Sequence, residues 1–187
     1  MNVNTAWQVA ISLIRNFKLK VIHGDSYNCR WLYSCPVGTK IKIHRGGSLC
    51  IGNHLSAQKG VLISVLPGAS LIIGDGLNIN TNCAIVAREK ITIGDNVIFG
   101  PDCKVYDHDH DYKKVGYERR NSFVTSEVSI GNGVWFGANC VVLKGTTIGD
   151  NCVFGAGSII KGEYPSNTLV IQERNEKRKT ITSLSEE

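Results

Sequence analysis

The sequence of this 187-residue chain predicts an all-β fold, a triangular solenoid of parallel strands with one protruding loop. Three observations predict it. The first is a large apolar residue at every sixth position: Ile130, Phe136, Val142, Ile148, Phe154 and Ile160. The second is the glycine that follows four of these six residues, and the third is the small side chain two positions before each of them. A period of six fits a repeated short strand and turn rather than a helix or a simple hairpin.

Three such strands and turns close one triangular coil of eighteen residues, as between Ile130 and Ile148. Strand alternation turns the apolar residue and the residue two before it into the prism. Neighbouring coils then pair at the usual strand spacing of about 4.8 Å, and several coils are needed to bury a continuous core. Four of the seven cysteines fall at the small inward positions, which predicts core packing rather than nucleophilic chemistry: Cys83, Cys103, Cys140 and Cys152.

The chain divides into three parts on this reading. Residues 1–40 form an N-terminal amphipathic helix and lead-in, residues 41–170 the solenoid, and residues 171–187 a polar basic tail. The apolar stretch from Ala6 to Ile14 is too short to cross a bilayer and is followed by a basic edge. We expect this short helix to pack on its own domain or on a partner subunit; peripheral contact with a membrane stays open as the alternative.

The charge and cysteine content of the chain argue against several classes of protein. A net charge of +5 without a broad basic stripe argues against a nucleic-acid partner. The seven cysteines contain no C-x-x-C pair, so neither a zinc ribbon nor a complete disulfide framework is predicted. No secretory signal is visible, and the default expectation is a cytoplasmic protein that is either free or membrane-peripheral.

The six-residue track stops at Val105 and resumes at Val128, so residues 106–127 leave the coil. Loops of this length in compact domains are usually functional or disordered. This one begins with the stretch DHDHDY, in which His108 and His110 would face the same side of an extended strand, as the ligands of an H-x-H zinc site do. No third histidine is suitably placed in the sequence, and we expect no metal.

Three motifs together resemble the hexapeptide-repeat O-acetyltransferases, in particular the galactoside, maltose and colanic-acid-type enzymes. They are IGDNVIFGP before the loop, HDY inside it, and IGNGVWFGANCVVLKGTTIGDNCVFGAGSIIKG after it. The resemblance implies a left-handed parallel β-helix, assembly as a homotrimer, acetyl-CoA as co-substrate and a carbohydrate acceptor. It favours an enzyme that acetylates a sugar hydroxyl in the synthesis of a surface polysaccharide.

The resemblance also implies roles for individual residues. His110, nine residues after Pro101, corresponds to the catalytic base, and the backbone N–H of Ala138 to the oxyanion donor. The expected acceptor contacts are Asn80, Asn82, Asp109 and Trp135. The expected coenzyme contacts, in a groove between subunits, are Ala138, Gly155, Ala156, Gly157, Lys161, Arg174 and Lys177. Two departures are Arg88, where the family often has an acidic residue, and the lack of the usual GVP segment near the end.

A histidine suits this chemistry because its side chain titrates nearest to neutral pH and can take the proton of an attacking hydroxyl. The sequence leaves open which group orients the ring: Asp107, Asp109, Asp111 or a backbone carbonyl. It also leaves open three other functions. These are a streptogramin-type antibiotic acetyltransferase, a metal-dependent β-helix enzyme of the carbonic-anhydrase type, and a non-catalytic scaffold.

Overall fold

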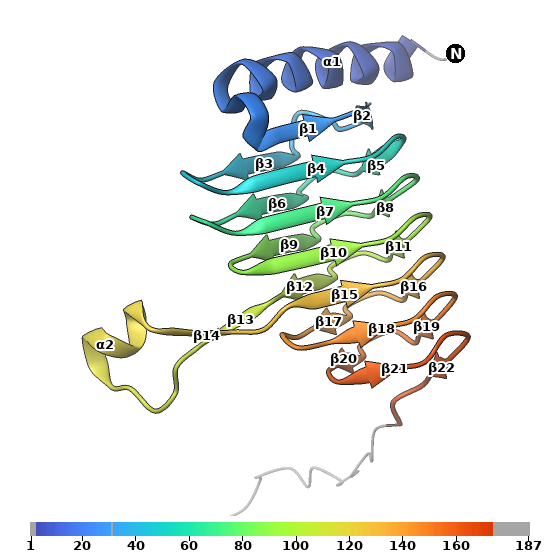
Figure 1. Cartoon of the computed structure of the whole chain (residues 1–187). Coiled ribbons are helices and arrows are strands. Elements are labelled where there is room, and N and C mark those ends of the chain that lie inside the picture. The colour runs from blue at the N-terminus through green and yellow to red at the C-terminus, as the bar shows by residue number, and fades with distance from the viewer. Residues whose placement is uncertain (1–2, 31, 174–187) are drawn as a thin grey trace, which may run out of the picture.

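The chain winds into a triangular prism, a left-handed parallel β-helix, in a computed structural model that describes residues 3–30 and 32–173. Three parallel sheets of seven, seven and six strands form its sides (Figure 1). The first sheet contains β1 (Tyr27–Cys29), β4 (Ser48–Ile51), β7 (Ser70–Ile73), β10 (Lys90–Ile93), β15 (Val128–Ile130), β18 (Thr147–Ile148) and β21 (Glu163–Tyr164). The second contains β2 (Leu32–Ser34), β5 (Leu55–Ala57), β8 (Asn78–Ile79), β11 (Ile98–Phe99), β16 (Trp135–Phe136), β19 (Val153–Phe154) and β22 (Leu169–Val170). The third contains β3 (Lys40–Ile43), β6 (Leu62–Val65), β9 (Ala84–Ala87), β12 (Lys104–Tyr106), β17 (Val141–Val142) and β20 (Ile159–Ile160).

The predicted inward positions form the core. Every apolar residue of the six-residue track, from Ile73 to Ile160, is at most 2% exposed, and the residues two positions before them are buried as well. The track also stacks its aromatic rings: the centroids of Phe99 and Phe136 lie 4.7 Å apart, and those of Phe136 and Phe154 lie 5.2 Å apart. The repeat therefore makes one continuous column of side chains through the prism.

The corner between the first and second sheets explains why the chain repeats an Ile-Gly-Asp/Asn element. The backbone N–H of Asn53 donates to Asp75 Oδ1 at 2.7 Å, and the N–H of Asp75 donates to Asp95 Oδ1 at 2.7 Å. The bond from Asn53 also holds the pKa of the Asp75 carboxyl below its ordinary value. A Cβ on Gly74 would lie 2.2 Å from Asp95 Oδ1, so this position requires glycine. Asn132 continues the ladder one coil later.

The N-terminal helix α1 (Val3–His23) lies across one end of the prism (Figure 1). It is longer than the short helix expected from the sequence, and a 3₁₀ turn, η1 (Gly24–Ser26), follows it. Leu19 and Ser12 are buried on its inner side, and the backbone N–H of Cys35 donates to Ser12 Oγ at 2.9 Å. No helix in the described ranges is long and apolar enough to span a membrane.

The first strands of the prism precede residue 41, where the hydrophobic track suggested its start. Tyr27 pairs with Leu49 and Cys29 with Ile51, in register with the later coils. The helix therefore caps a coil that begins directly after it, and Tyr27 is fully buried beneath this cap.

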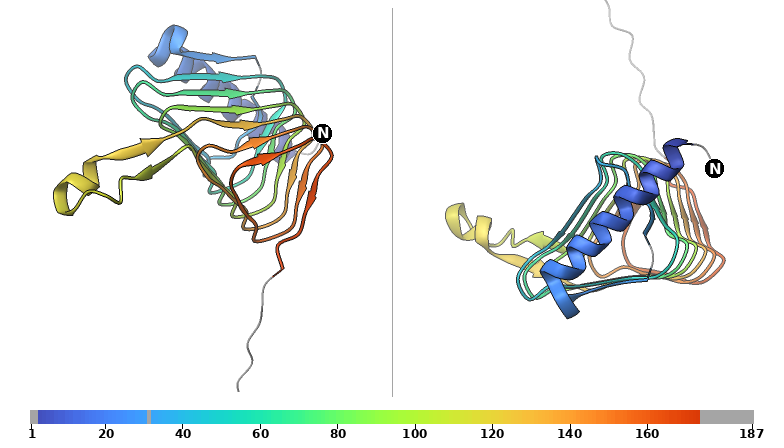
Figure 2. Two further views of the ribbon diagram at one scale, coloured as in Figure 1. Left: turned by 60° about the horizontal axis from the view of Figure 1, so that its bottom comes forward. Right: turned by 90° about the horizontal axis from the view of Figure 1, so that it is seen from above.

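The predicted loop is an arm that projects from one corner of the prism (Figure 2). It comprises β13 (His108–His110), α2 (Gly116–Asn121) and β14 (Phe123–Thr125). β13 and β14 pair antiparallel, with His110 opposite Phe123. The arm leaves the third sheet after β12 and re-enters the first sheet at β15, so the corner between the third and first sheets is its base.

Candidate active site

The pairing of the two strands of the arm determines which side chains lie on the same face of the hairpin. In an antiparallel hairpin alternate residues point to opposite sides, and directly opposed residues share a side. His108, His110 and Phe123 therefore share one face, as the sequence predicts for the two histidines. Asp109 and its partner Val124 lie on the other face, so the structure does not bring Asp109 next to His110.

The ring of His110 is held by the backbone of the same arm. His110 Nδ1 lies 3.0 Å from the carbonyl oxygen of Arg119, which can only accept a hydrogen bond. This contact assigns the proton to Nδ1 and leaves Nε2 as a proton acceptor. The ring also packs on Phe123, with centroids 4.5 Å apart, and the side chain is exposed. Of the orienting groups left open by the sequence, the structure favours the backbone carbonyl.

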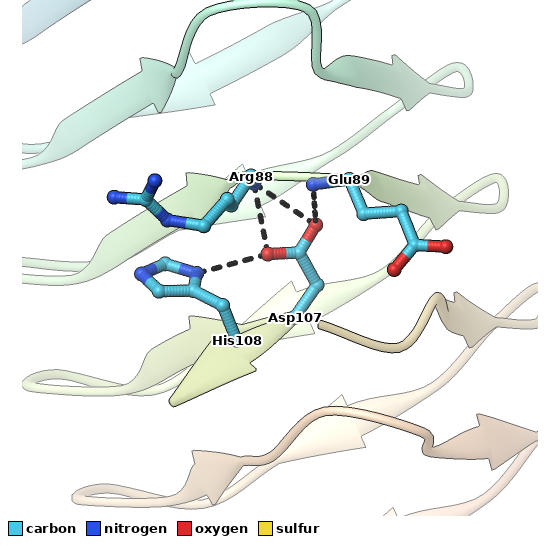
Figure 3. A network of polar contacts seen from close by, with 4 residues as sticks. All are labelled: Arg88, Glu89, Asp107 and His108. Carbon is cyan, nitrogen blue, oxygen red and sulfur yellow. Dashed lines mark hydrogen bonds and ion pairs between the residues drawn. The ribbon is translucent and has the colours of Figure 1, made fainter. Parts of the chain in front are cut away.

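The aspartate beside the histidines has a different task (Figure 3). Asp107 is fully buried, and its carboxylate accepts the backbone N–H of Arg88 at 2.8 and 3.0 Å and that of Glu89 at 2.8 Å. It also lies 2.9 Å from His108 Nδ1. Because Arg88 and Glu89 form the corner of the preceding coil, Asp107 fastens the base of the arm to the prism, and it orients His108 rather than His110.

Arg88 adds an unpaired positive charge next to this face of the arm. Its guanidinium carbon lies 3.4 Å from the centroid of the Phe123 ring, the same ring on which His110 packs. Arg88 Nε is buried without a hydrogen-bond partner, and the guanidinium forms no ion pair among the described residues. The sequence marked Arg88 as a departure from the family, but it gave no sign of this stacking.

An open cavity of about 350 Å³ lies beside His110. It is lined by His110, Gly116, Arg119 and Arg120. Two nitrogens of the Arg119 guanidinium already donate hydrogen bonds: Nε donates to the carbonyl of Lys114 at 2.7 Å, and Nη2 donates to that of Tyr112 at 3.3 Å. The cavity thus offers one imidazole and two arginines to an incoming molecule, and the two arginines were not predicted as site residues.

The remaining predicted residues gather mainly at the corner between the second and third sheets. There four turns stack on one another: residues 80–82, 100–102, 137–139 and 155–157. Backbone bonds join them, from Asp102 N to Thr81 O at 2.9 Å, from Asn139 N to Pro101 O at 2.9 Å, and from Gly157 N to Ala138 O at 2.7 Å.

The second residue of each turn decides whether the corner presents a free donor. The N–H of Thr81 is capped by its neighbour, Asn80 Oδ1, at 2.8 Å, and Pro101 has no N–H. The N–H groups of Ala138 and Ala156 have no hydrogen-bond acceptor in the described part of the chain. This row therefore offers two unpaired backbone donors in successive coils.

Asn80 and Asn82 have local structural roles at this corner. Asn80 caps its own turn, and Asn82 adopts a φ of +58°, which asparagine tolerates better than most residues. Trp135 lies on the outer face of the second sheet and is half exposed, while Lys161 follows β20 at the corner that carries the arm. Arg174 and Lys177 lie outside the described residues.

Within one chain, then, the predicted site residues fall into two groups on different corners. His110 projects from the corner between the third and first sheets, and Ala138 belongs to the corner between the second and third. Figure 2 shows the arm pointing away from the prism rather than folding back over it. A single protomer does not bring the imidazole beside the unpaired donor row.

The cysteines of the six-residue repeat are buried in the core of the prism. The thiols of Cys83, Cys103 and Cys140 donate to backbone carbonyls in adjacent turns at 3.1, 3.0 and 3.3 Å. Burial raises the pKa of the Cys35 thiol to about 11. Hydrogen bonds with the Cys103 thiol lower the pKa of Cys83 and lower that of Cys140 to about 7. These contacts support the predicted packing role. The described residues hold no cluster of three histidine, cysteine, aspartate or glutamate side chains suited to a metal ion.

Comparison with known proteins agrees with the fold and the repeat. Residues 127–162 match the family model described as bacterial transferase hexapeptide (six repeats). A galactoside O-acetyltransferase of Escherichia coli (strain K12) is 38% identical over 121 residues, which are 60% of this chain and 58% of that protein. A protein of the same organism named putative lipopolysaccharide biosynthesis O-acetyl transferase WbbJ is 28% identical over 68% of this chain and 69% of its own length. The chain spans about half to two thirds of the length of most curated relatives it matches.

Solved structures share the prism. The hexapeptide-repeat containing acetyltransferase VCA0836 from Vibrio cholerae superposes with a TM-score of 0.55 at 21% identity, over 90% of this chain and 87% of that one. A mutant of AntD, an N-acyltransferase from Bacillus cereus in complex with dTDP and coenzyme A, gives a TM-score of 0.62 at 20% identity, over 82% of each chain. At these identities the likeness concerns the fold.

Proposed function

We propose that this hexapeptide-repeat protein, which is related in sequence to O-acetyltransferases, transfers an acetyl group from acetyl-CoA to a hydroxyl of a carbohydrate. The observation that carries the proposal is the hydrogen bonding and exposure of the His110 ring. Its Nδ1 is committed to the Arg119 carbonyl, its ring is exposed, and Nε2 is therefore available to accept a proton. The names of the relatives support the donor and the reaction.

The reaction follows from these groups. His110 Nε2 takes the proton of the acceptor hydroxyl as that oxygen attacks the thioester carbonyl carbon of acetyl-CoA. The carbonyl oxygen becomes an oxyanion, which the N–H of Ala138 stabilises. Collapse of the tetrahedral intermediate breaks the C–S bond, and the imidazolium returns its proton to the CoA thiolate. The products are the sugar acetate and free CoA.

The two groups of site residues belong together only if two protomers meet. We place the arm of one protomer against the donor row of its neighbour in a homotrimer, with CoA lying between them along Gly155–Gly157 and Lys161. The separation of His110 and Ala138 on different corners of one chain supports this arrangement. Cyclic assembly is the ordinary way for a homotrimer to repeat such a contact three times.

The acceptor side carries positive charge in this arrangement. Arg119 and Arg120 line the cavity beside His110, and Arg88 stacks on Phe123, the ring on which His110 also packs. We therefore place an acceptor with a carboxylate or phosphate group in this cavity, with Asn80, Asn82 and Trp135 as further candidate contacts. Asp109, expected among them from the sequence, lies on the opposite face of the hairpin. A charged sugar of a surface polysaccharide or of its lipid-linked precursor has this chemistry. Because acetyl-CoA is an intracellular donor, we place the reaction in the cytoplasm.

Acetyl transfer to a panel of neutral and acidic sugars, followed by release of free thiol, tests the proposal. His110→Asn should lower kcat by about 10²- to 10⁴-fold, the usual contribution of a general base. His108→Asn is the matched control, because it changes the other imidazole of the same strand and should retain most of the activity. Equal losses in both variants, or full activity in His110→Asn, would exclude His110 as the base.

A further inference from the structure

The outward face of α1 is apolar. Trp7, Ile14, Phe17 and Val21 are 66, 68, 73 and 68% exposed. Their spacing of seven, three and four residues places them in one stripe of the helix, on the side opposite the buried Leu19. Leu13 and Ile22 widen the stripe. Soluble proteins rarely leave a contiguous apolar patch of this kind without a binding role.

The charges of the same helix are all positive. The segment from Val3 to His23 contains no aspartate or glutamate, and its titratable side chains are Arg15, Lys18, Lys20 and His23. Arg15 and Lys20 each donate to backbone carbonyls of the first coil, while Lys18 is exposed. The nearest acidic residue along the chain is Asp25, in the 3₁₀ turn that follows.

A basic cavity lies between the helix and the third sheet. Its volume is about 430 Å³, and no acidic residue lines it. The lining residues are Arg15, Lys18, Leu19, Ile22, His23, Thr39, Lys40, Ile41 and Lys42. Five of these nine are basic or histidine, so the cavity suits an anionic group such as a phosphate. Lys18 and Ile22 belong both to the cavity wall and to the exposed side of the helix.

The helix is also accessible to a flat surface. It is the outermost element at its end of the prism and lies across that end rather than along the side (Figures 1 and 2). The arm with His110 projects sideways from a later coil. A plane that touches α1 would therefore meet its apolar stripe first.

We propose that α1 and the basic cavity beside it dock this protein on an anionic lipid membrane. The stripe of Trp7, Ile14, Phe17 and Val21 enters the interface between headgroups and acyl chains, and the cavity lysines and arginine contact lipid phosphates. A second copy of this chain is a poorer occupant, because pairing through this stripe would bring two exclusively basic helices together. The inference does not depend on the proposed catalytic site.

Vesicle flotation of the full chain tests the docking surface. The protein should float with vesicles of phosphatidylcholine that contain about 30% phosphatidylglycerol, and bind pure phosphatidylcholine much more weakly. Raising the salt from about 0.05 to about 0.5 M should release it, because exposed charges are screened. The emission of Trp7 should shift to shorter wavelength on binding, and Trp7→Phe should abolish that shift.

Two substitutions separate the contributions. Phe17→Ser should lower the partition coefficient by about tenfold or more on every vesicle, because it removes inserted apolar surface. Lys18→Glu should weaken binding to the anionic vesicles alone. Leu169→Ser replaces another exposed apolar residue, near the other end of the prism, and should change nothing. Circular dichroism checks that each variant is folded.

Two results would contradict membrane docking through α1. One is a wild-type protein that stays with the soluble fraction on anionic vesicles at low salt. The other is Phe17→Ser protein that floats as well as wild type. If wild type does not float and Phe17→Ser reduces the size of the assembly in light scattering, the stripe joins copies of this chain instead.

Discussion

At the scale of single residues, the two adjacent histidines differ in their partners. His110 donates to a main-chain carbonyl and keeps a free acceptor nitrogen in an open cavity. His108 is mostly covered and bonded to the buried carboxylate of Asp107. The first environment suits proton transfer to and from a bound molecule, and the second suits anchoring.

The role of Arg88 in binding an acidic acceptor can be tested by substitution. Arg88→Gln should raise KM for methyl galacturonate by about 10- to 100-fold, the effect of losing one charge-assisted hydrogen bond. The same variant should leave KM for the neutral methyl galactoside nearly unchanged, because that sugar offers no anion to the guanidinium. Steady-state kinetics with this matched pair of acceptors measures the difference. An equal change for both sugars would mean that Arg88 only supports Phe123.

At the scale of elements, the arm depends on one carboxylate. Asp107 joins the start of the hairpin to the corner of the preceding coil through three backbone hydrogen bonds. The hairpin itself has only two short strands and a six-residue helix, too little to be stable alone. The position of His110 therefore relies on a residue that does not touch it.

Replacing this carboxylate should loosen the arm. Asp107→Ala leaves the partly buried N–H groups of Arg88 and Glu89 without their acceptor, at a cost of about 1–3 kcal/mol in the free energy of unfolding. Amide hydrogen exchange across residues 108–125 should accelerate, and kcat should fall while KM for acetyl-CoA holds. Asp107→Asn keeps one acceptor oxygen and should give a smaller effect. Unchanged exchange in Asp107→Ala would show that other contacts hold the arm.

At the scale of the whole molecule, much of the prism could be predicted because each short strand repeats the same pattern of apolar and small residues. Each sixth position is buried, so an apolar residue there is required in every coil. His110 could be found by its spacing from Pro101. The contact between Arg88 and Phe123 could not, because it depends on how two halves of a long loop pair. The run of strand-favouring residues Phe123, Val124 and Thr125 was an available sign of that pairing.

The resemblance to the family implied a groove between subunits, but the two corners that would meet in it are identified by the fold. A six-residue period gives the order of the sheets, but it does not say which corner faces a neighbouring protomer. The folded chain shows the imidazole and the unpaired N–H of Ala138 on separate corners. The central claim is therefore that a complete site contains His110 of one protomer and Ala138 of the next.

Subunit mixing tests this claim most directly. Ala138→Pro removes the donor N–H with little change of backbone, because Pro101 occupies the equivalent position one coil earlier. Trimers of this variant alone, and of His110→Ala alone, should both be inactive. Reassembly of equal amounts should restore about a quarter of wild-type activity, since about three quarters of random trimers are mixed and each mixed trimer holds one complete site of three. Mixed trimers, confirmed by mass, that show no activity above the separate variants would contradict the shared site.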